Sequence, residues 1–179
     1  MHGLVSLLPD QFYKRVVGLW SVLEVEFGLK GIQVTRFPHF SWQIGEDYPF
    51  QELKKGLDEI TKMITPFMVR TTGLGLFTGE TPVIYIPVVK TINLMGVHEK
   101  IWERFQTVGS GISEFYNPEN WMPHISLAYH DVDKNTIGEV MRFLAFERYD
   151  WEMKVDNISF IFELDGDFGE LKYKLSFTG

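Results

Sequence analysis

The chain has 179 residues, with 17 basic and 24 acidic side chains and a net charge of −7. Apolar residues make up 45% of the chain and charged residues 23%, a balance that excludes disordered and low-complexity proteins. The chain contains no cysteine, which excludes disulfide frameworks, thiol nucleophiles and cysteine-ligated metals. This length predicts one domain over residues 1–179, and the acidic balance argues against a groove for long nucleic acids, which needs a basic face.

The sequence shows no pattern typical of a membrane span or a signal peptide. No apolar run approaches the ~20 residues that span a bilayer, and residues 1–9 lack the basic start of a signal peptide. We therefore expect a cytoplasmic protein with no membrane partner. The apolar pattern does not determine the oligomeric state.

Hydrophobic periodicity predicts alternating helices and strands in the first half of the chain. In chain order they are a strand over 3–8, a helix over 10–27, a strand over 34–44, a helix over 50–64, and strands over 67–77 and 83–89. Pro87 lies in the last of these strands. Because proline cannot donate to a strand ladder, it predicts an edge position or a bulge there.

The second half repeats this order of elements. A helix is predicted over 97–108, a strand over 122–129, a helix over 136–146, and a hairpin closes the chain. The hairpin has alternating apolar residues on both sides of an Asp-Gly turn pair: Ile158, Phe160, Phe162, Leu164, then Asp165-Gly166, then Leu171, Tyr173, Leu175 and Phe177. Each half thus has a helix, a strand with a histidine, a helix and two antiparallel strands, which indicates an internal duplication.

The two strands that contain a histidine share a motif. They are Pro38-His39-Phe40-Ser41-Trp42 and Pro123-His124-Ile125-Ser126-Leu127. In a strand, residues i and i+2 share a face, so each histidine lies beside its own serine while the apolar neighbours face a core. This composition gives about 0.5 chance occurrences of His-x-Ser or His-x-Thr. A matching pair with the same proline and apolar neighbours, in the same place in each half, is not expected by chance.

The paired motifs, set in a duplicated α+β chain of this length, resemble the 2H phosphoesterases, which include the 2′-5′ RNA ligase-like proteins and cyclic nucleotide phosphodiesterases. The resemblance implies an α+β, bilobal fold with two pseudo-symmetric antiparallel β-sheets, flanked by helices around a central cleft. It also implies that His39 and His124 are the catalytic pair. Ser41 and Ser126 would then bind the non-bridging phosphate oxygens.

Two histidines suit the opening of a 2′,3′-cyclic phosphate by water, since one removes a proton and the other delivers one to the leaving oxygen. This chemistry requires no metal or other cofactor, and we interpret His130-Asp131-Val132-Asp133 as a turn and helix cap. The expected partner is a small nucleotide cyclic phosphate or an RNA end. Two alternatives remain open: a 2′-5′ RNA ligase or its reverse reaction, and a module that binds nucleotide or phosphate without turnover.

Four further residues are candidates for substrate contacts. Arg36 precedes the first histidine and is a candidate phosphate clamp, although a solvated charge is the simpler interpretation. Trp42, Phe77 and Tyr129 are candidates to stack on a nucleobase, with core packing as the alternative for each. Phe77 is favoured because it lies in a glycine-flanked stretch that would border the cleft.

Overall fold

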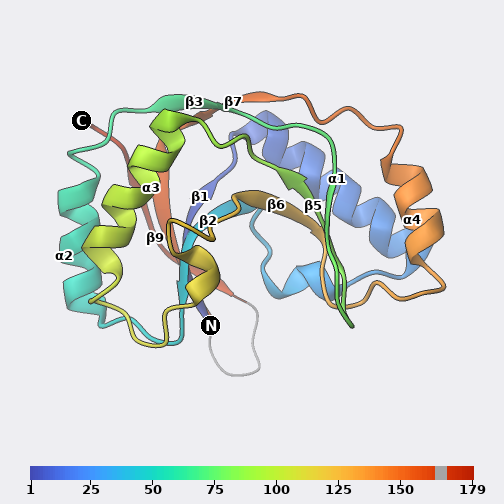
Figure 1. Ribbon diagram of the computed structural model, residues 1–179, viewed down its shortest axis with the longest axis horizontal. Coiled ribbons are helices and arrows are strands. Elements are labelled where there is room, and N and C mark those ends of the chain that lie inside the picture. Colours follow the sequence, from blue (N-terminus) through green and yellow to red (C-terminus); the bar gives the residue numbers. More distant parts are fainter. Residues whose placement is uncertain (164–168) are drawn as a thin grey trace.

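The computed structural model describes residues 1–163 and 169–179 and shows an α+β fold with antiparallel sheets (Figure 1). Its elements in chain order are β1 (His2–Leu7), α1 (Asp10–Phe27), η1 (Gly31–Val34), β2 (His39–Gly45), α2 (Phe50–Ile60), β3 (Phe67–Arg70), β4 (Gly75–Phe77), β5 (Val83–Pro87), α3 (Ile92–Phe105), η2 (Glu114–Tyr116), β6 (His124–Ala128), α4 (Ile137–Leu144), β7 (Glu152–Val155), β8 (Asn157–Phe162) and β9 (Glu170–Ser176). The predicted hairpin strands are confirmed as β8 and β9, whereas Leu164 and the Asp165-Gly166 turn lie outside the described residues.

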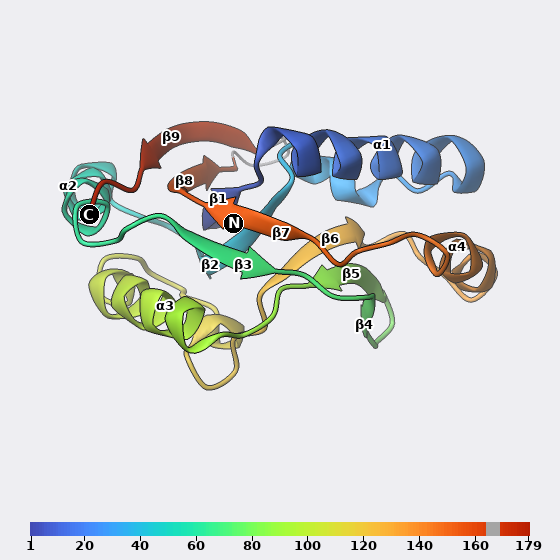
Figure 2. The ribbon, with the colours of Figure 1, turned by 90° about the horizontal axis from the view of Figure 1, so that it is seen from above.

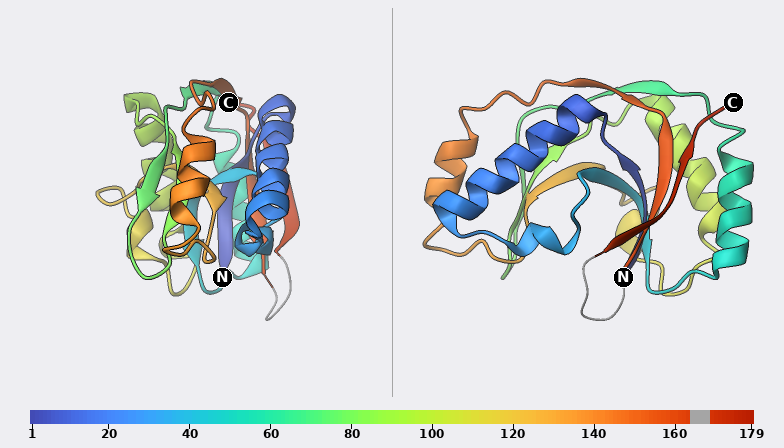
Figure 3. Two further views of the ribbon diagram at one scale, coloured as in Figure 1. Left: turned by 90° about the vertical axis from the view of Figure 1, so that its right-hand side faces the viewer. Right: turned by 180° about the vertical axis from the view of Figure 1, so that it is seen from behind.

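Two groups of antiparallel strands meet at the centre of the molecule. One sheet has the order β2-β1-β8-β9, another has the order β4-β5-β6, and β3 pairs with β7. An isolated bridge between Thr71 and Val88 connects the end of β3 to the end of β5. The strands with the histidines, β2 and β6, are edge strands of their two sheets, and they contact each other. The view from behind shows them meeting near the centre of the molecule (Figure 3).

The helices cover the outer faces of this arrangement. Figure 2 shows α1 and α3 on opposite sides of the strands, with α2 and α4 at opposite ends. One continuous apolar core spans both sheets and includes Phe40 and Trp42 from β2 and Ile125 and Leu127 from β6. Within residues 1–163 and 169–179, no helix combines the length and the apolar character that a membrane span requires.

The first helix occupies the predicted residues, and its end has a clear local cause. Gly28 adopts the left-handed conformation with φ of 72°, which glycine accepts without a steric penalty. The N–H of Gly28 bonds to the carbonyl of Glu24, and the N–H of Leu29 bonds to that of Leu23. These bonds satisfy the last helical carbonyls, so α1 ends at Phe27.

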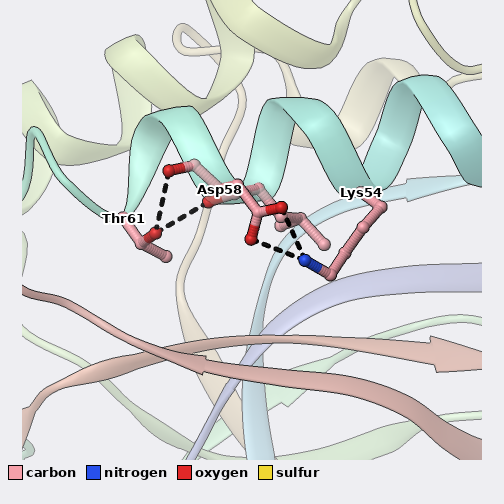
Figure 4. Close-up of polar contacts among 4 residues, drawn as sticks. Lys54, Asp58 and Thr61 are labelled. Carbon is pink, nitrogen blue, oxygen red and sulfur yellow. Dashed lines mark hydrogen bonds and ion pairs between the residues drawn. The ribbon is translucent and has the colours of Figure 1, made fainter.

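The second helix ends four residues earlier than predicted. The Thr61 hydroxyl donates to the Leu57 carbonyl at 2.9 Å and so satisfies a carbonyl in the last turn (Figure 4). One turn earlier, the Lys54 ammonium donates to both carboxylate oxygens of Asp58 at 2.6 Å. The apolar periodicity continues to Ile64, but residues 61–63 form a turn.

Two predicted strands differ clearly from the observed ones, and one observed strand was not predicted. The predicted strand over 34–44 begins only at His39, because residues 31–34 form the short helix η1. The predicted strand over 67–77 is two strands, interrupted near Gly73, whose φ of 51° does not fit an extended strand. The strand β7 was not predicted.

The edge position predicted for Pro87 is wrong. Strand β5 is the middle strand of β4-β5-β6, and Pro87 is its last residue, paired with His124. The irregularity in this pairing lies between Ile84 and Tyr85. A proline is accepted here because the ladder ends at this residue, while its carbonyl still accepts the N–H of Thr72.

Candidate active site

The two histidines have the same local geometry on different sheets. Nδ1 of His39 lies 2.5 Å from the Phe37 carbonyl oxygen, and Nδ1 of His124 lies 2.6 Å from the Met122 carbonyl oxygen. Because a carbonyl only accepts, each Nδ1 carries the hydrogen. In each neutral ring Nε2 is therefore left as the proton acceptor.

Burial determines the charge state of this pair. The pKa of His39 is lowered to about 4, mainly because burial disfavours the charged ring; the hydrogen bond to the Phe37 carbonyl opposes this shift, and the charge of His124 adds to it. Burial likewise lowers the pKa of His124. Both rings are thus neutral at pH 7, and the two are close enough to affect each other's protonation. A bound anion would favour the protonated form of either ring.

The serines lie beside their histidines as the alternation predicts. Ser41 and Ser126 are half-buried, whereas their apolar neighbours in the motif are buried in the core. Each serine carbonyl also accepts an indole N–H: Trp121 donates to Ser41 at 2.9 Å, and Trp20 donates to Ser126 at 3.1 Å. No sequence signal pointed to these two indoles, because each belongs to a segment distant along the chain from the strand it contacts.

Aromatic rings lie against the second histidine. The ring of Phe77 packs edge-on to His124 with centroids 5.0 Å apart, so this candidate lies directly beside the second histidine. Tyr85 lies 5.1 Å from His124 and stacks on Phe77 at 4.2 Å. Tyr85 was not predicted. Its ring lies over Gly75, where any Cβ would overlap it. The glycine at this position is therefore the feature of the sequence that could have indicated a ring packed against the strand.

Trp42 does not contact the site. Its side chain is fully buried, its indole N–H donates to the Ser6 hydroxyl at 2.9 Å, and its ring stacks on Trp121 at 5.5 Å. The prediction that it stacks on a nucleobase is therefore wrong. The cause is the strand alternation that places His39 and Ser41 on one face and Trp42 on the other.

Arg36 and Tyr129 lie outside the regular strands. Arg36 is exposed in the loop between η1 and β2 rather than on a predicted strand, and its carbonyl accepts from the Tyr13 hydroxyl at 3.3 Å. Tyr129 follows β6 and is half-buried, and its ring contacts that of His130 at 3.7 Å. Burial raises the pKa of the Tyr129 phenol, and the negative charge of Glu163 adds to the effect.

The acidic turn after β6 has a structural role. One oxygen of Asp131 accepts the N–H groups of Lys30 and Gly31 at the start of η1. Asp133 accepts the N–H of Thr136 at 2.8 Å, which confirms the predicted turn before α4, whereas the helix itself is capped by Thr136 without a side-chain hydrogen bond. In the part of the chain that the structure describes, no three His, Asp or Glu side chains group as metal ligands would.

A family model now identifies the chain. The model of the 2′-5′ RNA ligase superfamily matches residues 34–167, which include both His-x-Ser motifs. The chain belongs to this superfamily. The resemblance to 2H phosphoesterases that the paired motifs indicated is thereby confirmed. A comparison with curated protein sequences finds no match.

Several solved structures share the fold of this chain. TT0787 of Thermus thermophilus aligns with a TM-score of 0.72 at 17% identity, covering 99% of this chain and 98% of that chain. Escherichia coli LigT in its apo form aligns with a TM-score of 0.67 at 13% identity, covering 99% and 97%. LigT complexed with 3′-AMP aligns with a TM-score of 0.64 at 13% identity, covering 99% and 98%. At these identities the likeness shows the fold.

Proposed function

We propose that the protein is a metal-independent phosphodiesterase that hydrolyses a 2′,3′-cyclic phosphate on a nucleotide or RNA end. The observation that carries this proposal is the matched pair of imidazoles. His39 and His124 each bond through Nδ1 to the carbonyl two residues earlier, and each keeps Nε2 for proton transfer. Two neighbouring bases of this kind suit a reaction that removes one proton and delivers another.

The proposed mechanism uses one histidine in each protonation state. The neutral ring accepts a proton at Nε2 from the attacking water, and the protonated ring donates its proton to the leaving 2′ or 3′ oxygen. The substrate's phosphate raises the pKa of the nearer ring and so favours the acid form. Ser41 and Ser126 donate hydrogen bonds to the non-bridging oxygens, where charge develops in the transition state. Which bond of the ring breaks assigns the acid and base roles.

The superfamily supports a nucleotide as the ligand class. Escherichia coli LigT, whose fold this chain shares, has been solved in complex with 3′-AMP. A 3′-monophosphate is one of the two products that opening a 2′,3′-cyclic phosphate can give. The Phe77 ring beside His124 is the proposed face for the base or ribose.

The test is a time course on 2′,3′-cyclic nucleotides in EDTA, followed by phosphorus NMR. His39→Ala and His124→Ala should each lower the rate ~10²- to 10⁴-fold. The matched control is His130→Asn, which removes an exposed imidazole. Asparagine tolerates the positive φ of 69° at this position, so the backbone should not be strained. This control should keep the wild-type rate.

Other outcomes select the alternatives. A wild-type protein that is folded but silent on every cyclic nucleotide contradicts the proposal, as does full activity in either alanine variant. Joining of RNA ends, with binding that weakens steeply as salt rises, supports the 2′-5′ RNA ligase instead. Tight nucleotide binding without turnover supports the binding module.

A further inference from the structure

The two motif strands contact each other without sharing a sheet. Strand β2 contains His39 and strand β6 contains His124, and in the described ranges each is the edge strand of its own sheet. Carbonyls on the outer side of an edge strand have no ladder partner. Among these residues, therefore, no backbone ladder sets the position of one motif against the other.

Two indoles make the same bond to the two motifs, each from the other half of the chain. Trp121 lies in the loop before β6, and its indole N–H donates to the Ser41 carbonyl of β2 at 2.9 Å. Trp20 lies in α1, and its indole N–H donates to the Ser126 carbonyl of β6 at 3.1 Å. One donor is in a loop and the other in a helix, so the repeated order of elements does not by itself produce the shared bond.

The Trp121 indole is held firmly against the first motif strand. Its side chain is only 1% exposed. The ring of His98 stacks on it with centroids 3.8 Å apart and planes 4° from parallel, and the Trp42 ring stacks at 5.5 Å. Because side chains in a close-packed core have few alternative positions, the indole N–H stays aimed at the Ser41 carbonyl.

A bulge in β2 adds a second bond between the same segments. The pairing with β1 skips Trp42, which is therefore the extra residue of the bulge. Its carbonyl oxygen lies 3.1 Å from Nε2 of His98, which belongs to α3. A carbonyl only accepts, so this nitrogen donates. Side chains from the second half thus hold two consecutive carbonyls of the first motif, those of Ser41 and Trp42.

The chain after Trp121 leads directly to the second histidine. The next carbonyl, that of Met122, accepts the hydrogen bond from Nδ1 of His124. Trp121 itself is fixed by its backbone N–H, which donates to the Asn117 carbonyl at 2.9 Å. A displacement of Trp121 from the first motif would therefore also move the group that orients the His124 ring.

We infer that Trp20 and Trp121 are positioning residues that hold the two motif strands at a fixed separation and so set the distance between the two histidines, an inference that rests on the proposed function. Two imidazoles that act on one phosphorus centre must each lie within hydrogen-bond reach of their own oxygen. A misplacement of ~1 Å costs up to ~10²-fold in rate. An indole suits this task because it is rigid and its N–H only donates.

The test measures kcat and KM on a 2′,3′-cyclic nucleotide for wild type, Trp20→Phe, Trp121→Phe and the double variant. Phenylalanine keeps an aromatic ring and removes the N–H. Each single variant should lower kcat ~5- to 20-fold and change KM less than ~2-fold, because the groups that bind the substrate remain while their alignment is lost. The double variant should lose more than the product of the two single losses, because both bonds hold the same separation.

The matched control is Trp151→Phe. This indole is also buried, and its N–H also donates to a backbone carbonyl, that of Arg148 at 2.9 Å, outside both motifs. The control loses the same kind of bond and should keep the wild-type kcat. The NMR signals of the histidine rings add a measurement that needs no turnover. Trp20→Phe removes a bond to β6, yet it should shift the ring signals of His39 on β2, whereas the control should not.

The outcomes separate this inference from the proposed function. In an active wild type, the positioning role is overturned by full kcat in both indole variants, by a double loss equal to the product of the single losses, or by an equal loss in Trp151→Phe. A wild type without activity contradicts the proposed function. The histidine signals then decide the positioning role, and unshifted His39 signals in Trp20→Phe overturn it. If Trp121→Phe does not fold, full kcat in Trp20→Phe alone overturns the inference.

Discussion

Replacing Asn157 with alanine should destabilise the fold beside the first histidine. The amide is buried at the start of β8, where Oδ1 accepts the N–H of Leu7 at 3.0 Å and the hydroxyl of Ser159 at 3.1 Å. Its Nδ2 donates to the Leu7 carbonyl at 3.0 Å. The side chain thus takes the place of a strand partner for the last residue of β1. Leu7 pairs with His39 across the sheet, so the bond network reaches the candidate site.

The expected loss follows from the partners left behind. Alanine leaves three buried polar groups without a bond, and each costs about 1–3 kcal/mol. We expect the free energy of unfolding to fall by ~3 to 5 kcal/mol, a large part of the stability of a typical domain. Urea unfolding measures this, with Asn93→Ala, an exposed asparagine, expected to stay within ~0.5 kcal/mol. A loss below ~1 kcal/mol with an unchanged m-value would refute the role given to the amide.

Three further predictions concern pH and packing. Because burial lowers the pKa of His39 to about 4 and also lowers that of His124, both limbs of the kcat/KM profile should lie below pH 6.5; a profile centred near pH 8 would contradict this. Burial also lowers the pKa of His98 to about 4, so as the pH falls from 6.5 to 4 the unfolded chain gains a proton that the folded chain does not. The free energy of unfolding should therefore fall by up to ~3 kcal/mol across that range, and a His98→Gln variant should lose this part of the pH dependence in urea titrations. Gly75→Ala should cost ~1–3 kcal/mol and lower kcat, because its Cβ overlaps the Tyr85 ring beside the second histidine; an unchanged melting temperature would speak against that packing.

Local patterns predicted the parts of the site that local geometry decides. The i, i+2 rule of a strand placed His39 with Ser41 and His124 with Ser126, and the structure keeps both pairs half-buried. The same rule placed Trp42 on the core face of the strand, and the structure shows its side chain buried there rather than free to stack on a base. Helical periodicity likewise predicted α1 residue for residue, since spacing and a terminal glycine define a helix locally.

The sequence by itself thus determined the fold class, the two motifs and the family. Tertiary structure decided how the lobes are assembled, because the sheet of the first histidine takes β8 and β9 from the far end of the chain, while the second sheet takes β4 and β5 from the first half. It also brought Trp20, Trp121 and Tyr85 to the two motifs. Pairing between segments 100 or more residues apart depends on the packing of the whole core and leaves no periodic trace in either segment, so no local pattern reveals it.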